Sequence, residues 1–383
     1  MKKTAMLITL LFCSLSLSAQ GGPQFKDVPL TGIEGTPAYT DGNKYQKDAL
    51  LFVDMLAATH PYYIRAERRF VLESRLPDLL EACADCGSDA EFAALLREAM
   101  KEVRDRHTDV IDEASYSAQK SGAKSAKAES AAAAEDARSP LTRGGELFSY
   151  RIFAPESICY LQFNQCNDAR SLRDESLPRF DKLLEKMFAE MEQEEIETLI
   201  VDLQYNNGGS SRLCDELLDR LRPLSELRNL DSYLRFSPML ALYNPKVGEA
   251  MAAWEAAGHK DELYPIRQRA VRTEPHDCYG GKVVFIQGPK TYSSAGILVT
   301  LARDNAIGEV IGTESDYSPS HYGEVIPFRL PNTGLLGSVC TKYFERPDKA
   351  RAEDKSLSPD TFVNLDDKQV AWDTILKMYA KKI

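Results

Sequence analysis

Apolar and polar positions along this chain predict strands and helices in alternation. Short apolar runs typical of buried strands occur at 158–163, 198–203 and 283–286. Helical spacing of apolar residues follows the second and third runs, at 213–221 and 297–302. Strands that alternate with helices are typical of layered α/β domains. We therefore expect the main part of the protein to be an α/β core.

The N-terminal part of the chain has helical periodicity only. Three helices are predicted there, at 49–58, 70–82 and 92–103. Ser88 and Glu91 have the spacing of a capping box before the third helix. The periodicity then breaks, and a strand is expected near Val110. We interpret residues 45–113 as a small helical N-terminal subdomain.

Composition sets the remaining boundaries. Residues 20–44 are rich in Gly and Pro and form an irregular lead-in. Residues 114–143 consist mainly of Ser, Ala and Lys, which are too poor in large apolar side chains to pack a core, and are predicted to be a low-complexity linker. The core then extends over 144–383, with an aromatic-rich insertion at about 225–277 and a terminal helix expected over 361–380.

The first residues have the pattern of a secretory signal peptide. Residues 1–19 contain two early lysines, an apolar stretch and small residues that end at Ala19. The apolar stretch is too short to span a bilayer, and no other apolar run in the sequence is long enough to do so. Cys13 lacks the small residue that precedes a lipidated cysteine, so lipoprotein processing is the less favoured alternative. We expect a protein exported to the periplasm or beyond.

Charge and cysteine content argue against some classes of partner and cofactor. The chain has 383 residues, 43% of them hydrophobic, and a formal net charge of −11, which argues against a nucleic-acid partner. Cys83 and Cys86 form a lone CxxC pair after a helical stretch, for which we expect a local disulfide or two inert thiols. No group of His, Cys or Asp has metal-ligand spacing, so no metal or organic cofactor is expected.

Two turns carry candidate chemistry. Ser293 and Ser294 lie between the 283–286 strand and the following helix, where a serine hydroxyl can be exposed beside the first amides of the helix. The alternative is that both serines only cap the helix. Gly208 and Gly209 follow the 198–203 strand and would let backbone amides approach a ligand, or form a plain turn.

Four segments in order resemble the tail-specific (C-terminal processing) serine peptidase family. They are Thr59-His60-Pro61 with Asp105-Arg106-His107-Thr108, ICYLQF, VDLQYNNGG, and FIQGPKTYSSAG with the following VIGTES. The resemblance covers about Tyr45 to Asp348. It implies a stacked αβ spiral like that of crotonase and the Clp protease subunit, and it implies a serine peptidase.

The resemblance also implies roles for individual residues. Ser293 falls on the family's nucleophile, and the amides of Gly208, Gly209 and Ser294 fall near its oxyanion hole. Attack on an amide produces a tetrahedral oxyanion, and each preorganised donor to it is worth about 3 kcal/mol. The two turns would then converge on one carbonyl.

The base departs from the commonest family pattern. Many members use a lysine at the position held here by Ser318, but no lysine lies between Lys290 and Lys342. A second branch, similar to the tricorn core protease, uses a histidine before the core, and His107 has that place. An unperturbed imidazole has a pKa of about 6.5, which suits proton transfer at neutral pH. The resemblance favours His107 as base over His321.

The acid that would orient the imidazole is taken from the stretch that carries it in the tricorn-like branch. Glu345 is the preferred candidate, with Glu324 and Asp348 as alternatives. The family's peptide-binding PDZ module is not expected, because residues 114–143 are too short and too polar for it.

Our hypothesis is a secreted or periplasmic serine endopeptidase that hydrolyses peptide or protein substrates through an acyl-enzyme, with Ser293 as nucleophile and His107 as base. The alternative is a catalytically inactive relative that binds peptides or another exported ligand in the same cleft. The sequence does not indicate an oligomeric state.

Overall fold

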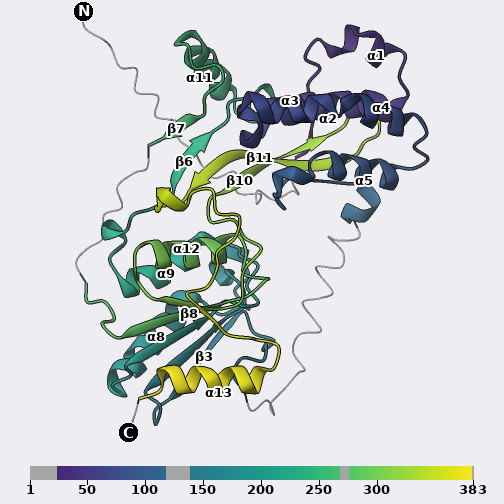
Figure 1. The fold of residues 1–383 in the computed structure, drawn as a ribbon. Helices are drawn as coiled ribbons and strands as arrows, with labels where there is room; N and C mark the ends of the chain where they lie inside the picture. The colour runs from purple at the N-terminus through teal and green to yellow at the C-terminus, as the bar shows by residue number, and fades with distance from the viewer. Residues whose placement is uncertain (1–23, 118–138, 268–275, 382–383) are drawn as a thin grey trace, which may run out of the picture. The chain divides into compact units, whose positions relative to one another are not determined.

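The computed structural model describes residues 24–117, 139–267 and 276–381, and the chain divides into two compact units (Figure 1). The first unit combines the N-terminal part with 232–267 and 322–344, and the second combines 125–231, 268–321 and 345–383, as far as these are described. Each unit contains one six-stranded sheet with helices. The expected mixture of α and β structure is thus confirmed.

The first unit packs its helices on a sheet with the strand order β1-β10-β11-β6-β7, and β2 pairs with β11. The strands are β1 (Lys26–Asp27), β2 (Asp109–Ile111), β6 (Asp231–Leu234), β7 (Tyr264–Ile266), β10 (His321–Arg329) and β11 (Leu336–Glu345). The helices are α1 (Pro37–Thr40), α2 (Lys44–Thr59), α3 (Ala66–Ser74), α4 (Leu76–Ala84), α5 (Asp89–Ala99), α10 (Pro238–Tyr243) and α11 (Pro245–Ala256). Helix α2 and strand β10 share a core, with the rings of Phe52 and Phe328 6.1 Å apart.

Local sequence explains where these helices begin and end. Asn43 caps α2 in a complete capping box. The single helix predicted over 70–82 is instead α3 and α4, because Arg75 ends the first and Pro77 lies in the first turn of the second. Ser88 caps α5 as predicted, but Glu91 accepts from the amide of Gly87 and does not complete a capping box.

The second unit is a sheet of order β12-β9-β8-β5-β4-β3, in which β3 is antiparallel to β4 and the other pairs are parallel. The strands are β3 (Phe148–Phe153), β4 (Ile158–Phe163), β5 (Thr198–Asp202), β8 (Lys282–Gln287), β9 (Glu309–Gly312) and β12 (Thr361–Phe362). The helices are α7 (Ala169–Leu172), α8 (Phe180–Gln193), α9 (Ser211–Leu221), α12 (Ser294–Asp304) and α13 (Lys368–Tyr379).

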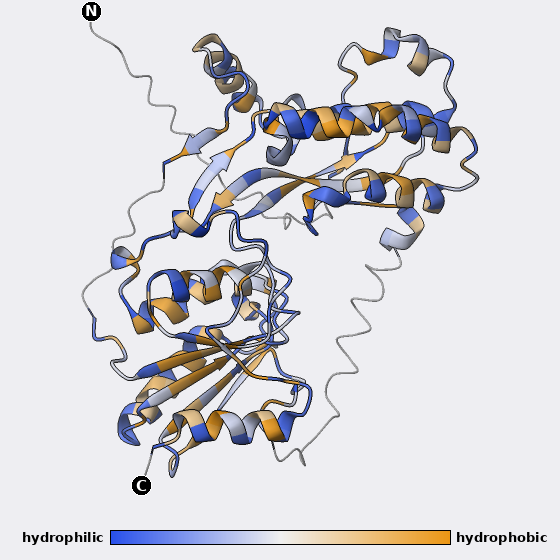
Figure 2. Ribbon diagram, in the orientation of Figure 1, coloured by the Kyte–Doolittle hydropathy of each residue, from blue (hydrophilic) through white to orange (hydrophobic). Residues whose placement is uncertain are grey.

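The central strands of this sheet are buried, and Figure 2 shows them as a largely hydrophobic layer. The apolar runs predicted as strands therefore form the core strands β4, β5 and β8. The terminal helix predicted from residue 361 begins later, at Lys368, after the cap Asp367. Residues 361–362 form β12, because their backbone pairs with Ile311 and Gly312 of β9.

Three sequence predictions fall at least partly outside the described residues. They concern the signal peptide at 1–19, most of the linker at 114–143, and the end of the insertion at about 225–277. Within the described residues, no helix has both the length and the apolar character needed to cross a bilayer.

Candidate active site

Ser293 has a strained backbone at the turn between β8 and α12. Its φ is 52° and its ψ is −126°, a conformation that costs a residue with a Cβ about 1–3 kcal/mol. A sharp strand-to-helix turn of this kind presents a nucleophile at the edge of a sheet. Ser293 also occupies the N-cap of α12 without a capping hydrogen bond from its side chain. Capping therefore does not explain this serine.

The neighbouring Ser294 has a structural role. Its side chain is buried, and its hydroxyl donates to the carbonyl of Gly209 at 2.8 Å. This bond ties the first turn of α12 to the loop that follows β5. The hydroxyl of Ser294 is thus engaged, and Ser293, to which the resemblance assigned the role of nucleophile, is the candidate.

The paired glycines allow the loop after β5 to contact the serine turn. Gly208 has φ +98°, and a Cβ added there would lie 2.7 Å from Cβ of Ser293 and 3.0 Å from the amide nitrogen of Ser294. Gly209 has φ +138°, and its added Cβ would lie 2.5 Å from the carbonyl oxygen of Cys166. Both positions require glycine for conformation and for space. The loop after β5 therefore packs directly against the turn of Ser293, which a plain turn would not do.

The sheet explains why these two loops meet. Strands β5 and β8 are parallel neighbours, with Asp202 paired to Ile286. Parallel strands end at the same edge, which is where α/β proteins bind ligands. The amide of Tyr292 donates to the carbonyl of Asn206 at 3.0 Å, which joins the loops directly.

Asn206 is a site residue that the sequence analysis missed. It is fully buried, and its Nδ2 donates to the carbonyl of Phe163 at the end of β4 at 2.8 Å. Its Oδ1 accepts from the amide of Gly208 at 2.8 Å. One carboxamide therefore joins the end of β4 to the glycine loop. A polar residue at the carboxyl end of a buried strand, next to paired glycines, was the feature that could have identified it.

The bond to Asn206 corrects the predicted set of oxyanion donors. Because the Gly208 amide already donates to a buried side chain, it is engaged in holding the loop. The amides of Gly209 and Ser294 have no hydrogen-bond acceptor among the described residues. Two of the three predicted donors are therefore available to a ligand, and the third positions them.

His107 belongs to the first unit and lies just before β2. Its amide donates to Oδ1 of Asp105 at 2.9 Å, and its ring Nδ1 lies 3.1 Å from the same oxygen. Its carbonyl accepts from the hydroxyl of Ser338 at 2.7 Å. The imidazole is 26% exposed, so it is anchored at one side and still accessible.

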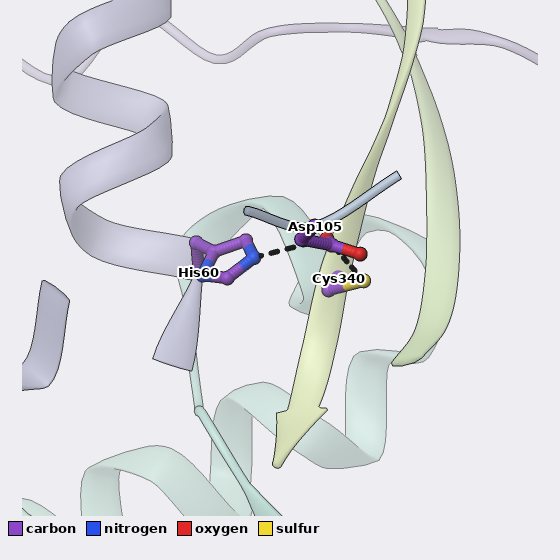
Figure 3. A group of neighbouring side chains, drawn as sticks. All are labelled: His60, Asp105 and Cys340. Atoms are coloured by element: carbon purple, nitrogen blue, oxygen red, sulfur yellow. Dashed lines mark hydrogen bonds and ion pairs between the residues drawn. The ribbon is translucent and has the colours of Figure 1, made fainter. Parts of the chain in front are cut away.

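Asp105 also joins His107 to a buried cluster that consists of His60, Asp105 and Cys340 (Figure 3). Nε2 of His60 lies 3.3 Å from Oδ2 of Asp105, and the thiol of Cys340 donates to that oxygen at 3.0 Å. The three ligand atoms lie within 4.8 Å of one another, close enough to hold a metal ion. The sequence analysis expected no metal-ligand group, because these residues are far apart in the chain.

The donor chemistry favours a hydrogen-bonded cluster over a metal site. The thiol of Cys340 donates to Oδ2 of Asp105 at 3.0 Å, and Nε2 of His60 lies 3.3 Å from the same oxygen, so these groups already satisfy one another. Oδ2 of Asp105 also accepts from the amide and hydroxyl of Thr108, at 3.1 and 2.7 Å. We interpret the cluster as the anchor of Asp105.

Comparison with known proteins identifies the family. The sequence model of Peptidase family S41 matches residues 157–363, which include the glycine loop and the serine turn. The chain belongs to peptidase family S41. It is a serine-type peptidase with peptide or protein substrates, and the resemblance to tail-specific peptidases is confirmed.

One solved structure supports the fold of this S41 peptidase. A candidate peptidase from Parabacteroides merdae is 18% identical, with a TM-score of 0.55, and the match covers 87% of this chain and 94% of that one. The photosystem II D1 C-terminal processing protease is 10% identical with a TM-score of 0.48, and the match covers 88% and 98% of the two chains. No curated protein matches the sequence.

The alternative base His321 is the first residue of β10, where the division between the two units falls. Its buried ring packs on Tyr317 with centroids 5.0 Å apart, and Tyr317 packs on Tyr292 at 5.3 Å. Tyr317 also covers Gly296 in the first turn of α12, where an added Cβ would lie 2.2 Å from its ring. These contacts give His321 an aromatic packing role behind the serine turn.

Two of the three candidate acids, Glu324 and Glu345, form ion pairs with lysines. Glu324 forms an ion pair with Lys342 at 2.6 Å in the first unit. Glu345, preferred on resemblance, forms one with Lys349 at 2.9 Å. Asp348 follows on the same stretch, where its amide donates to Asp304 at 3.0 Å.

Cys83 and Cys86 are free thiols. Burial raises the pKa of the Cys83 thiol to about 12, so it is unreactive near neutral pH. Burial also raises the pKa of the Cys86 thiol, so two inert thiols stay our prediction for this pair.

Proposed function

We propose that this S41 peptidase is an endopeptidase in which Ser293 attacks the scissile carbonyl. The observation that carries the proposal is the strained turn of Ser293, held against Gly208 at the edge of the parallel sheet. His107 takes the proton from the hydroxyl of Ser293 and passes it to the leaving amine. The acyl group on Ser293 is then released by water.

The oxyanion hole in this proposal consists of the amides of Gly209 and Ser294. Neither amide has a hydrogen-bond acceptor within the described residues. Ser294 directly follows Ser293, and Gly209 directly follows Gly208, whose backbone packs against Ser293. Each donor that is fixed before the reaction contributes about 3 kcal/mol to transition-state stabilisation. Asn206 and Gly208 hold the loop after β5 in place, so the two donor amides are already positioned when substrate binds.

We place the enzyme in the serine/histidine branch similar to the tricorn core protease. Ser318 stands where other members have the lysine, and its hydroxyl donates to the carbonyl of Lys355 at 2.9 Å. The resemblance implies Glu345 as the acid, but the mechanism proposed for Ser293 and His107 does not depend on that assignment.

We also propose a fold type and a location for this enzyme. The parallel strands β4, β5, β8 and β9 with the crossover helices α8, α9 and α12 are consistent with the stacked αβ spiral that the family resemblance implies. The N-terminal sequence pattern implies export, which places the enzyme in the periplasm or outside the cell.

A fluorophosphonate probe tests the nucleophile and base directly. The purified mature protein should be labelled, and labelling should be lost in Ser293→Ala and fall at least 100-fold in rate in His107→Ala. Ser294→Ala is the matched control, since it removes the adjacent hydroxyl but not its amide, and it should still be labelled. Failure of the correctly folded wild type to react would favour the inactive peptide-binding relative.

A further inference from the structure

One buried carboxylate, Asp105, determines how His107 is held. The amide and ring Nδ1 of His107 both lie within hydrogen-bond distance of Oδ1 of Asp105, at 2.9 and 3.1 Å. The Asp105 side chain is only 3% exposed. Water therefore cannot screen its interaction with the ring as it would at the surface. The contact is between the base of the proposed mechanism and a desolvated negative charge.

This contact selects one tautomer of the imidazole. A carboxylate oxygen can only accept hydrogen bonds, so Nδ1 of His107 must carry the proton. In a neutral ring Nε2 is then the unprotonated nitrogen, which is the form that can accept a proton from a serine hydroxyl. When the ring becomes charged during the reaction, the same carboxylate stabilises the imidazolium.

The other oxygen of Asp105 is held by groups that keep the carboxylate in place. Oδ2 accepts from Thr108 and Cys340 and contacts Nε2 of His60 at 3.3 Å. Nδ1 of His60 accepts from the amide of Tyr62 at 3.1 Å, so the proton of a neutral His60 is on Nε2 and points at Asp105. The carboxylate is thus fixed by the nearby Thr108 and by donors from two distant parts of the chain, His60 and Cys340.

These bonds also keep Asp105 ionised. Burial alone would raise its pKa, but hydrogen bonds from His107 and His60 hold the pKa well below its ordinary value. Glu345 offers less to an imidazole, because its carboxylate is 24% exposed and pairs with Lys349. The geometry around His107 therefore favours the carboxylate two residues before it in the sequence.

We infer that Asp105, rather than Glu345, is the positioning residue that sets the orientation and tautomer of His107. The inference rests on the proposed role of His107 as base. An Asx turn, in which Asp105 only closes the loop through the amides of His107 and Thr108, is the competing explanation. It predicts no effect on the protonated nitrogen of the ring.

The test is nitrogen NMR of the His107 ring combined with fluorophosphonate labelling rates. The His107 resonances are assigned by their loss in His107→Gln. In wild type we expect the Nδ1–H form. In Asp105→Asn the isosteric amide can donate to the ring, so we expect the Nε2–H form and a labelling rate lower by about 10²–10⁴-fold.

Thr108→Val is the matched control, because it removes a hydrogen bond to Oδ2 but leaves the contact with Nδ1 of His107. It should lower stability while the Nδ1–H form of His107 persists. Asp105→Glu restores a carboxylate and should recover the Nδ1–H form at least in part. If Asp105→Asn does not fold, the His107 tautomer and the labelling rate can still be measured in Asp105→Glu.

Two results overturn the inference. One is an Nε2–H tautomer in wild type, and the other is an Nδ1–H tautomer that persists in Asp105→Asn. A loss of that tautomer in Glu345→Gln alone would transfer the role to Glu345. Failure of the proposed function gives a different result, since His107→Gln would then label at the wild-type rate while the NMR still reports whether Asp105 orients the ring.

Discussion

The serine turn of the second unit and the Asp105 cluster of the first unit are built by opposite means. The serine turn depends on backbone: a residue with a Cβ at positive φ, two glycines at positive φ, and a helix N-terminus with unsatisfied amides. The Asp105 cluster depends on side chains that satisfy one buried charge with several donors. A nucleophile needs exposure and free donors, whereas the base needs a fixed orientation.

The largest expected effect is at the serine turn. Ser293→Ala should lower the rate of hydrolysis of an unfolded test protein, such as casein, by at least about 10⁴-fold, because the acyl-enzyme can no longer form. The variant should unfold at the same or slightly higher urea concentration, since the strained residue keeps its Cβ and loses no capping bond. Near-normal hydrolysis would remove Ser293 from the mechanism.

Gly208→Ala should damage the same turn through space alone. The added methyl would overlap Cβ of Ser293 at 2.7 Å, so one of the two loops must shift. We expect a loss of about 10²-fold in labelling rate and of about 1–3 kcal/mol in the free energy of unfolding.

Gly258→Ala is the matched control for this effect. Gly258 has a similar φ of +95°, but no atom lies within 4 Å of an added Cβ. It should lose stability from the backbone conformation and keep the wild-type labelling rate. Equal labelling losses in the two variants would show that the close approach of Gly208 to Ser293 has no functional importance.

The Asp105 cluster should show its effect in stability against pH. Because the pKa of Asp105 is lower in the folded state than its unfolded value near 4, its stabilisation is fully present above about pH 4 and is lost as the pH falls further. Asp105→Asn should therefore cost about 2–3 kcal/mol at pH 7, and the difference from wild type should narrow below pH 4. Urea unfolding at several pH values measures it, and a difference independent of pH would contradict the assignment.

The smallest effect is expected at Cys340. Cys340→Ala removes one of the donors to Asp105 and should lower the free energy of unfolding by about 1–2 kcal/mol. Cys340→Ser keeps a donor and should lose less. Chemical denaturation of the two variants tests this order, and the reverse order would show that the thiol contributes only by filling space.

Prediction from sequence succeeded where neighbouring residues decide the outcome. The strands β4, β5 and β8 and the helices α9 and α12 follow from local periodicity, and the start of α5 follows from its cap Ser88. The break between α3 and α4 and the short strand β12 were missed. A proline near a helix start and the pairing of two residues with a distant strand leave almost no periodic pattern.

Local periodicity was enough to predict the α/β pattern and to place Ser293 and the paired glycines in two turns that each follow a buried strand. The residues alone left Ser293 and Ser294 as alternatives and only the family resemblance pointed to Ser293, whereas the structure adds the hydrogen bond that engages the Ser294 hydroxyl. The sequence could not show that Asn206 engages the Gly208 amide, or that His60 and Cys340 surround Asp105. Helix and strand patterns arise from residues a few positions apart, whereas a buried charge is satisfied by whichever donors the fold brings to it.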